Sequence, residues 1–123
     1  MVATLAGLLD AYLIAHHGNG DSNVPAVLAG LRPRVAIVNN GEYKGGTAAT
    51  LSTLRATPGL EGGVWQLHRS MSNGAEDFPD AFIANLEADD KDLAAWLKVT
   101  ANEDGSFSMT NSRTGATKTY DRR

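Results

Sequence analysis

The stretch Asp10–His16 reads DAYLIAH and is followed by Gly-Asn-Gly at positions 18–20. A continuous apolar run of this length, bounded by turn-forming residues, is typical of a strand that is buried on both faces of a sheet. The same pattern returns at Arg34–Asn39 (RVAIVN) and at Gly63–His68 (GVWQLH). The sequence therefore predicts three buried strands in its first half.

Two short helices are predicted between these strands. Ser22 or Asn23 can cap a first helix, which Pro33 stops, and Thr47 can cap a second helix that runs to Ala56. The resulting order is strand, helix, strand, helix, strand, which is a pair of βαβ units. Right-handed crossovers make the strands of such units parallel neighbours.

The C-terminal part of the chain has a different pattern. Ala94–Ala101 alternates between two faces, and Asp-Gly at 104–105 is a strong hairpin signal. The intervening Ala81–Leu86 (AFIANL) fits either one helical turn or a short strand. We predict a mixed α/β (α+β) fold, with βαβαβ over 10–68 and an antiparallel hairpin region over 94–120.

Length and composition favour a single domain that spans 1–123. Hydrophobic residues make up 42% and charged residues 20% of the chain, which are ordinary values for a folded protein. The net charge of −3 makes nucleic-acid binding by charge alone unfavourable. The apolar stretches are too short to span a membrane, and Met1–Leu9 lacks the basic residues of a signal peptide, so the sequence leaves the compartment open.

Polar residues with useful chemistry follow each of the three predicted strands. His16 and His17 end the first strand, Asn40 and Lys44 follow the second, and His68 ends the third. The carboxyl ends of parallel strands meet at one edge of a sheet, where ligands bind in α/β proteins. Neutral imidazole is a common zinc ligand, so the histidines are candidate metal ligands. The glycine-rich stretch that leads into the second helix can hold an anion, to which Lys44 adds charge.

Each of these features also has an ordinary structural interpretation. Two histidines at a strand end can simply face solvent, on opposite sides of the strand. The glycine-rich stretch after Lys44 can be a turn that leads into a helix cap, and its spacing does not match a phosphate-binding P-loop. Residue types alone leave these alternatives open. A serine hydrolase is disfavoured because the sequence contains no Gly-x-Ser-x-Gly motif.

Several blocks of the sequence, taken in order, resemble a known family. They are DAYLIAHHGNGDSN at 10–23, NNG at 39–41 with KGG at 44–46, WQLH at 65–68 and FIANL at 82–86. This series is similar to the C-terminal half of bacterial hydrolases of the metallo-β-lactamase fold, in the branch related to the hydrolase domain of ComEC-type DNA-uptake proteins. The resemblance extends from about Leu9 to Tyr120.

The resemblance implies a fold and a chemistry. The family is an αββα sandwich with one or two metal ions at the edge between its two sheets, where they activate water for hydrolysis. By this resemblance His17 is a metal ligand, and His16 is its neighbour, a second ligand or a substrate contact. Asn40, Lys44 and His68 then line the substrate cleft. Zinc is the expected ion, and manganese is the alternative.

The sequence also departs from the family pattern. The main ligand cluster of the family, His-x-His-x-Asp-His, belongs to its N-terminal half and has no match here. The chain is thus expected to be the C-terminal half of a sandwich, inactive alone, in which Met1 marks a truncation or an internal start. The substrate of the complete enzyme is expected to be a small molecule.

Half a sandwich should leave one apolar sheet face exposed, and soluble monomers rarely tolerate this. We therefore expect either a homodimer or the missing N-terminal half to cover that face. Two other functions remain open. One is a non-catalytic interaction module that uses the exposed face, and the other is a nuclease-like hydrolase, which the acidic composition disfavours.

Overall fold

The computed structural model describes residues 7–23, 25–87 and 94–123. Most of the apolar stretch Met1–Leu9 therefore lies outside the described residues. The elements of the first half alternate between strands and helices: β1 Ala11–Leu13, the 3-10 turn η1 Ala15–Gly18, α2 Pro25–Leu31, β2 Val35–Val38, α3 Ala48–Ala56 and β3 Val64–His68. The second half contains mainly strands: η2 Asp80–Phe82, β4 Ile83–Asn85, β5 Leu97–Ala101, β6 Phe107–Asn111 and β7 Thr117–Tyr120.

The strands form two sheets. β1, β2, β3 and β4 lie side by side in that order and are all parallel, whereas β5, β6 and β7 form an antiparallel sheet. The expected mixed fold, with a βαβαβ unit followed by an antiparallel region, is confirmed. Ala81–Leu86, which fitted either a turn or a strand, forms both, because η2 leads directly into β4.

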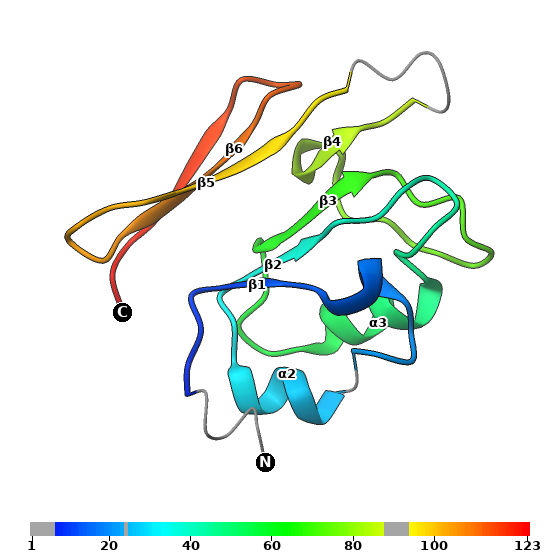
Figure 1. The fold of residues 1–123 in the computed structure, drawn as a ribbon, viewed down its shortest axis with the longest axis horizontal. Coiled ribbons are helices and arrows are strands. Elements are labelled where there is room, and N and C mark those ends of the chain that lie inside the picture. Colours follow the sequence, from blue (N-terminus) through cyan, green and yellow to red (C-terminus); the bar gives the residue numbers. More distant parts are fainter. Residues whose placement is uncertain (1–6, 24, 88–93) are drawn as a thin grey trace.

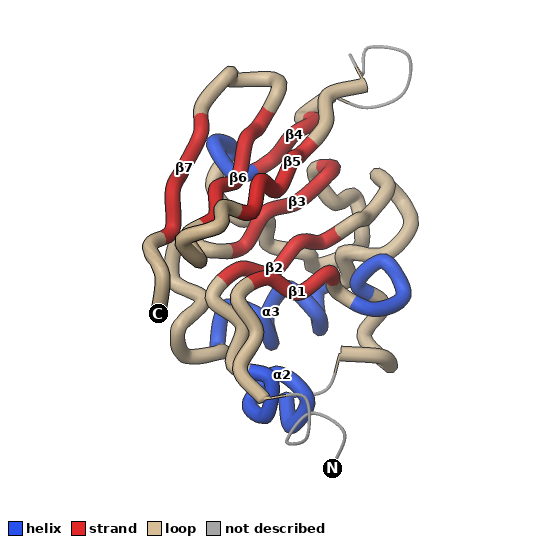
Figure 2. The backbone as a smooth tube through the Cα atoms, turned by 60° about the vertical axis from the view of Figure 1, so that its left-hand side comes forward, coloured by secondary structure: helices blue, strands red, loops and turns tan. Residues whose placement is uncertain are grey.

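The molecule has three layers, with the parallel sheet in the middle (Figure 1). Helices α2 and α3 cover one face of this sheet, and the antiparallel sheet lies on its other side (Figure 2). Helix α3 starts as the sequence predicts, since the side chain of Thr47 accepts a hydrogen bond from the backbone N–H of Thr50. Among the described residues, no helix has the length and apolar character needed to cross a membrane.

Two separate apolar clusters hold these layers together. The first lies between the helices and the parallel sheet, and it contains Ile14, Leu28, Ala36, Val38, Leu51, Leu54, Leu60 and Val64. The second lies between the two sheets and contains Val35, Trp65, Phe107 and Met109. Burying a leucine or a valine stabilises a fold by about 1.5–3 kcal/mol relative to leaving it exposed.

The second cluster corrects one expectation. We expected the face of the parallel sheet opposite the helices to be exposed and to need a second copy or another half of the protein as a cover. In the structure Val35 and Trp65 on this face are 0% and 3% exposed, because Phe107 and Met109 of the same chain pack on them. Covering this face is therefore no longer a reason to expect a dimer.

The first strand is shorter than predicted. β1 ends at Leu13, and the following residues form a 3-10 turn in which His16 and His17 have φ of 51° and 56°. The expectation that these histidines extend the strand and point to opposite sheet faces is therefore wrong. The apolar pattern of DAYLIAH does not reveal the turn, because Ile14 and Ala15 are as apolar as the strand itself.

Candidate metal-binding turn

The turn at 15–18, which we call the histidine turn, lies at the carboxyl end of β1. His16, His17 and Gly18 all have left-handed backbone conformations, with φ of 51°, 56° and 83°. Non-glycine residues rarely adopt this conformation, and it persists only where the surroundings hold it. Residues held in such conformations cluster at functional sites, and this turn lies at the sheet edge where α/β proteins commonly bind ligands.

The buried side chain of Asn23 is one of the groups that hold the histidine turn. Asn23 is 2% exposed, and its amide donates to the carbonyl oxygens of Ala15 at 2.9 Å and Asn19 at 3.1 Å. Its side-chain oxygen accepts from the backbone N–H of Ala15 at 3.1 Å. One side chain therefore ties both ends of the turn, a role that the sequence suggested only as a possible helix cap.

Two glycines of the loop after β2 pack directly against the histidine turn. The N–H of Gly46 donates to the carbonyl oxygen of His17 at 2.9 Å. A Cβ atom placed on Gly45 would lie 1.9 Å from the same oxygen, so only glycine fits at this position. The KGG sequence at 44–46 thus allows the backbone of one loop to approach the backbone of the other.

The imidazole of His17 is exposed but has a fixed partner. Its Nδ1 lies 2.9 Å from the carbonyl oxygen of Asn39, the residue that follows β2. Since a carbonyl oxygen only accepts, this contact favours the tautomer in which Nδ1 is protonated and Nε2 has a lone pair. Histidines that bind metals commonly donate their other ring nitrogen to a backbone carbonyl in this way.

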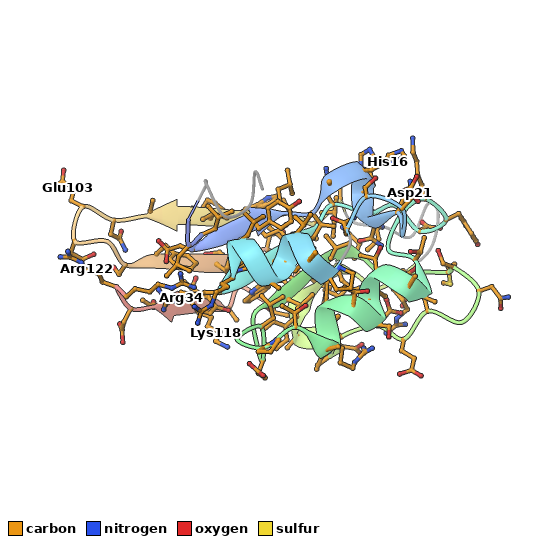
Figure 3. All side chains as sticks on the ribbon, turned by 90° about the horizontal axis from the view of Figure 1, so that it is seen from below. His16, Asp21, Arg34, Glu103, Lys118 and Arg122 are labelled. Carbon is orange, nitrogen blue, oxygen red and sulfur yellow. The ribbon has the colours of Figure 1, made fainter. Side chains whose placement is uncertain are left out.

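His16 has a different environment from that of His17. Its Nδ1 lies 3.4 Å from the hydroxyl of Ser22 and 3.7 Å from a carboxylate oxygen of Asp21. Both contacts involve the same ring nitrogen, whereas a catalytic serine–histidine–aspartate relay uses both nitrogens of the ring. This cluster therefore lacks the geometry of a nucleophilic triad. Figure 3 shows His16 and Asp21 at one end of the molecule, far from Glu103 and Arg122.

Asn40 and His68 lie at the ends of the neighbouring strands β2 and β3. Asn40 is 1% exposed, and its amide donates to the carbonyl oxygen of His68 at 2.9 Å while its side-chain oxygen accepts from the N–H of His68 at 3.3 Å. The side chain of Asn40 thus fixes the spacing of two strand ends. His68 itself is half-buried at the same sheet edge.

Lys44 lies on the exposed part of the loop that follows β2, beside Tyr43, which is 72% exposed. This loop contacts the loop after β3, because the N–H of Met71 donates to the carbonyl oxygen of Glu42 at 2.7 Å. The hydroxyl of Ser70 also donates to the carbonyl oxygen of Gly46 at 2.7 Å. The loops after β1, β2 and β3 are therefore joined into one edge.

The sequence did not identify the groups that join these loops. Ser70 bonds to the loop after β2 through its hydroxyl, and the carboxylate of Asp77 accepts from the backbone N–H of Ser70 at 2.9 Å and from the side-chain amide of Gln66 at 2.6 Å. Serine and aspartate in a polar loop are common, and nothing in their spacing distinguishes these two. The glycine pair at 45–46 was the one detectable signal.

A metal site would need more ligands than this edge supplies. Catalytic zinc sites normally have three protein ligands and an open position. Within the described part of the chain, no group of three or more His, Cys, Asp or Glu residues is placed to hold a metal ion. His17 has the geometry of one ligand, but a complete site does not assemble from the described residues.

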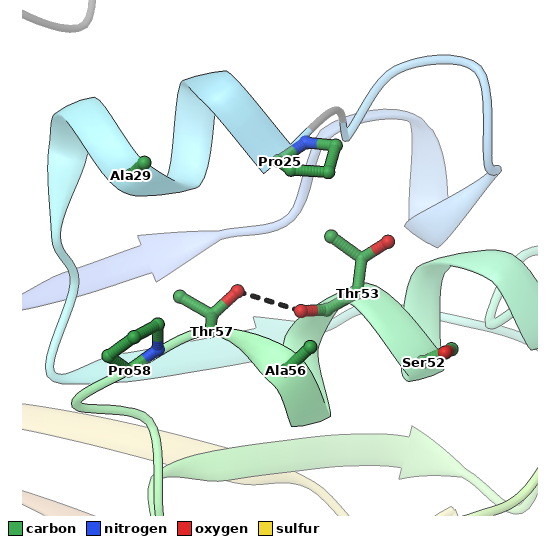
Figure 4. A pocket seen from close by; sticks show the side chains of 7 residues that line it. All are labelled: Pro25, Ala29, Ser52, Thr53, Ala56, Thr57 and Pro58. Atoms are coloured by element: carbon green, nitrogen blue, oxygen red, sulfur yellow. Dashed lines mark hydrogen bonds between the residues drawn. The ribbon is translucent and has the colours of Figure 1, made fainter.

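A pocket of about 320 Å³ lies in the helical layer, between α2 and α3 (Figure 4). It is lined mainly by small or apolar residues: Pro25, Ala29, Ser52, Thr53, Ala56, Thr57 and Pro58. The hydroxyl of Thr57 donates to the carbonyl oxygen of Thr53 at 2.7 Å, as Figure 4 shows. With no titratable residue in its lining, the pocket offers no acid, base or metal ligand.

Comparisons with known proteins do not assign the chain to a family. No protein-family model, no curated protein and no solved structure matches the chain. The candidate site therefore depends on the geometry of the histidine turn and on the chemistry of its residues.

Proposed function

We propose that this chain is the C-terminal part of a metal-dependent hydrolase of the metallo-β-lactamase superfamily, and that His17 is one of its metal ligands. One observation supports the assignment of His17 above all others. Its Nδ1 lies within hydrogen-bond distance of the carbonyl oxygen of Asn39, a contact that favours protonation at Nδ1 and leaves the lone pair of Nε2 available to a metal ion.

The rigidity of the histidine turn supports the same assignment. A metal ligand must be held in place before the metal binds, because ordering a loose side chain lowers the affinity. Asn23 and the backbone of Gly45 and Gly46 hold the turn from two sides.

Zinc is the ion that this ligand favours, because imidazole suits zinc while carboxylate-rich sites favour manganese. In the complete enzyme the metal would lower the pKa of a bound water and polarise the substrate. Since the described residues supply one well-placed ligand, we propose that the other ligands come from another polypeptide segment. The chain alone is then inactive as a hydrolase.

The remaining candidate residues have separate proposed roles. Lys44 is exposed on the loop beside the histidine turn and can attract an anionic group of a small substrate. His16 and His68 lie at the same edge and are proposed substrate contacts. Asn40, which was a candidate substrate contact, is buried and bonded to the backbone of His68, so we propose a positioning role for it.

Zinc titration by calorimetry tests the role of His17. We expect weak zinc binding to the wild-type chain that disappears in His17→Ala. His16→Ala is the matched control, because it removes an exposed imidazole from the same turn without removing the contact to Asn39, and it should retain binding. Manganese should bind more weakly than zinc. Equal zinc binding by wild type and His17→Ala would contradict the proposal.

A hydrolase assay with added zinc tests the second part of the proposal. Generic ester, lactam and phosphodiester substrates should remain intact with this chain alone. Zinc-dependent hydrolysis that survives His17→Ala would show that a different site performs the chemistry. Cleavage of DNA with added manganese would instead favour a nuclease-like enzyme.

A further inference from the structure

β5 forms one exposed edge of the antiparallel sheet. Every residue from Lys98 to Ala101 is exposed, including Val99, which is 43% exposed. Val99 lies opposite Met109 of β6, a residue that is 0% exposed, so both side chains are on the face that points toward the parallel sheet. The inner face of β6 is therefore buried against the parallel sheet, whereas the inner face of β5 is largely open to solvent.

The hydrogen bonds of the β5–β6 ladder show which backbone groups point outward. At its two ends, the N–H of Asn102 donates to Ser106 at 2.9 Å and the N–H of Ser112 donates to Trp96 at 3.0 Å. Pairing alternates along an antiparallel ladder, so the even-numbered residues of β5 bond to β6. The N–H and C=O groups of Leu97, Val99 and Ala101 therefore point away from β6. They have no hydrogen-bond partner among the described residues.

The two outer strands of the parallel sheet, β4 and β1, do not offer a comparable edge. The carbonyl oxygen of Ile83 in β4 accepts from the amide of Asn111 and from the guanidinium of Arg113, both at about 3.0 Å. On the other side of the parallel sheet, β1 has only three residues, Ala11–Leu13. β5 is thus longer than β1 and, unlike β4, is not capped by side chains.

We propose that a second copy of this chain pairs with this edge, β5 against β5, in antiparallel orientation about a two-fold axis at Val99. The two three-stranded sheets then become one continuous sheet. Unpaired edge strands are templates for such pairing. Among the described residues β5 contains no proline, and its one charged residue, Lys98, alternates with Leu97 and Val99 and so lies on the face away from the parallel sheet. A two-fold axis makes the contact close on itself, as expected for a dimer.

The sequence of β5 is complementary to itself in this register. Val99 faces Val99 of the partner subunit, Leu97 faces the partner's Ala101, and Lys98 faces the partner's Thr100. In this register the outward N–H and C=O groups of residues 97, 99 and 101 lie opposite the same groups of the partner subunit and can form hydrogen bonds with them. Apolar side chains meet on the inner face, and no lysine stands directly opposite another lysine.

The edge of β7 is less suited to pairing with a second copy, because of the charge at its centre. In β7 the outward residues are Thr117 and Thr119, because the N–H of Asn111 donates to Ala116 at 3.1 Å and this fixes the alternation. Pairing both threonines with a second copy would centre the axis on Lys118 and place two ammonium groups opposite each other. Like charges in this position are destabilising.

The mass of the chain in solution tests the proposal. Light scattering from low to high micromolar concentration should show a mass that approaches twice that of one chain. Val99→Pro removes an outward N–H without removing a bond to β6, so it should give a monomer with an intact fold. Thr119→Pro makes the matching change on the edge of β7 and should leave the dimer intact.

Disulfide trapping tests the register, and it also decides the case if the proline variants fail to fold. The chain has no cysteine, so Val99→Cys introduces a single thiol. A directly opposed hydrogen-bonded pair has Cα atoms about 5.5 Å apart, within the range for a disulfide. Val99→Cys should form a covalent dimer under oxidising conditions, and Lys98→Cys or Thr119→Cys should form far less. A monomer at every concentration would overturn the proposal, as would a dimer that persists in Val99→Pro or is not trapped by Val99→Cys.

Discussion

The histidine turn and the layer between the two sheets are held by different kinds of interaction. The turn depends on backbone hydrogen bonds, one buried amide and close glycine contacts, and it leaves two imidazoles exposed. The layer between the sheets is held by aromatic side chains that are largely withdrawn from water. The candidate site and this core therefore lie in separate parts of the molecule. Replacing a core side chain should leave zinc binding unchanged, and replacing an exposed imidazole should leave stability nearly unchanged.

The aromatic layer contains two ring pairs joined by a hydrogen bond. The rings of Trp65 and Phe82 are 4.7 Å apart in an edge-to-face arrangement, and those of Phe107 and Tyr120 are stacked at 5.0 Å. The indole N–H of Trp65 donates to the hydroxyl of Tyr120 at 3.1 Å, which joins the two sheets. Such pairs stabilise a fold by about 0.5–1.5 kcal/mol beyond the burial of their area.

The largest loss of stability is expected for Trp65→Ala. This change empties the centre of the layer and should lower the free energy of unfolding by about 3–5 kcal/mol, as measured by urea denaturation. Trp96→Ala is the control, because Trp96 is 50% exposed and its removal should change stability by no more than about 0.5 kcal/mol. Equal effects of the two changes would contradict the assignment of the core.

Gly45→Ala should have the next largest effect, because its Cβ would collide with the carbonyl oxygen of His17. We expect a loss of about 3 kcal/mol and weaker zinc binding. Gly115→Ala is a matched control, since Gly115 has φ of 72° against 74° for Gly45 but no atom within 4 Å of its Cβ position. It should lose about 1–2 kcal/mol from backbone strain alone. If the control costs as much as Gly45→Ala, the contact with His17 is unimportant.

Tyr120 should make stability depend on pH in the alkaline range. Burial raises the pKa of Tyr120 above its ordinary value of 10.0, although the hydrogen bond from Trp65 opposes the shift. The unfolded chain then loses this proton first, so stability is complete below pH 10 and declines as the pH rises through and beyond that value.

Tyr120→Phe tests this origin. At neutral pH it should cost about 1 kcal/mol, because the hydroxyl accepts from the indole of Trp65 and donates to the carbonyl oxygen of Gly62. It should also remove part of the alkaline decline in melting temperature. Tyr43→Phe serves as the control, because Tyr43 is 72% exposed and its replacement should leave the pH profile unchanged. An identical decline in wild type and Tyr120→Phe would assign the pH dependence to other groups.

The smallest effect on stability is expected for His17→Ala. The imidazole is exposed and makes one hydrogen bond at the surface, so its loss should change the free energy of unfolding by less than about 1 kcal/mol. The same change should abolish zinc binding. A large loss of stability would mean that His17 supports the fold and would weaken its assignment as a ligand.

Local sequence signals predicted the first half of the fold well. The buried strands β2 and β3 and the cap at Thr47 follow from short apolar runs and from turn residues next to them. The cover of the parallel sheet by the antiparallel sheet could not be predicted in this way. It depends on Phe107 and Tyr120 meeting Trp65 across more than forty positions of sequence, as the separation of 55 between Trp65 and Tyr120 shows.

The placement of the candidate residues near one sheet edge was predictable from the sequence, but their geometry was not. The sequence indicated that His17 lies at the end of the first strand, and the structure places it just beyond that end. The left-handed turn depends on Asn23, Gly45 and Gly46, which hold it through contacts that local patterns do not encode. Asn40 was identified as polar and near the edge, but its burial could not be foreseen from its type.

The most direct test of the central claim is the tautomer of the His17 imidazole, measured by nitrogen NMR shifts of the ring during a zinc titration. The account predicts a neutral ring protonated at Nδ1, with Nε2 unprotonated and shifting as zinc is added, while His16 responds less. A ring protonated at Nε2, or a His17 signal that zinc leaves unchanged, would contradict the account.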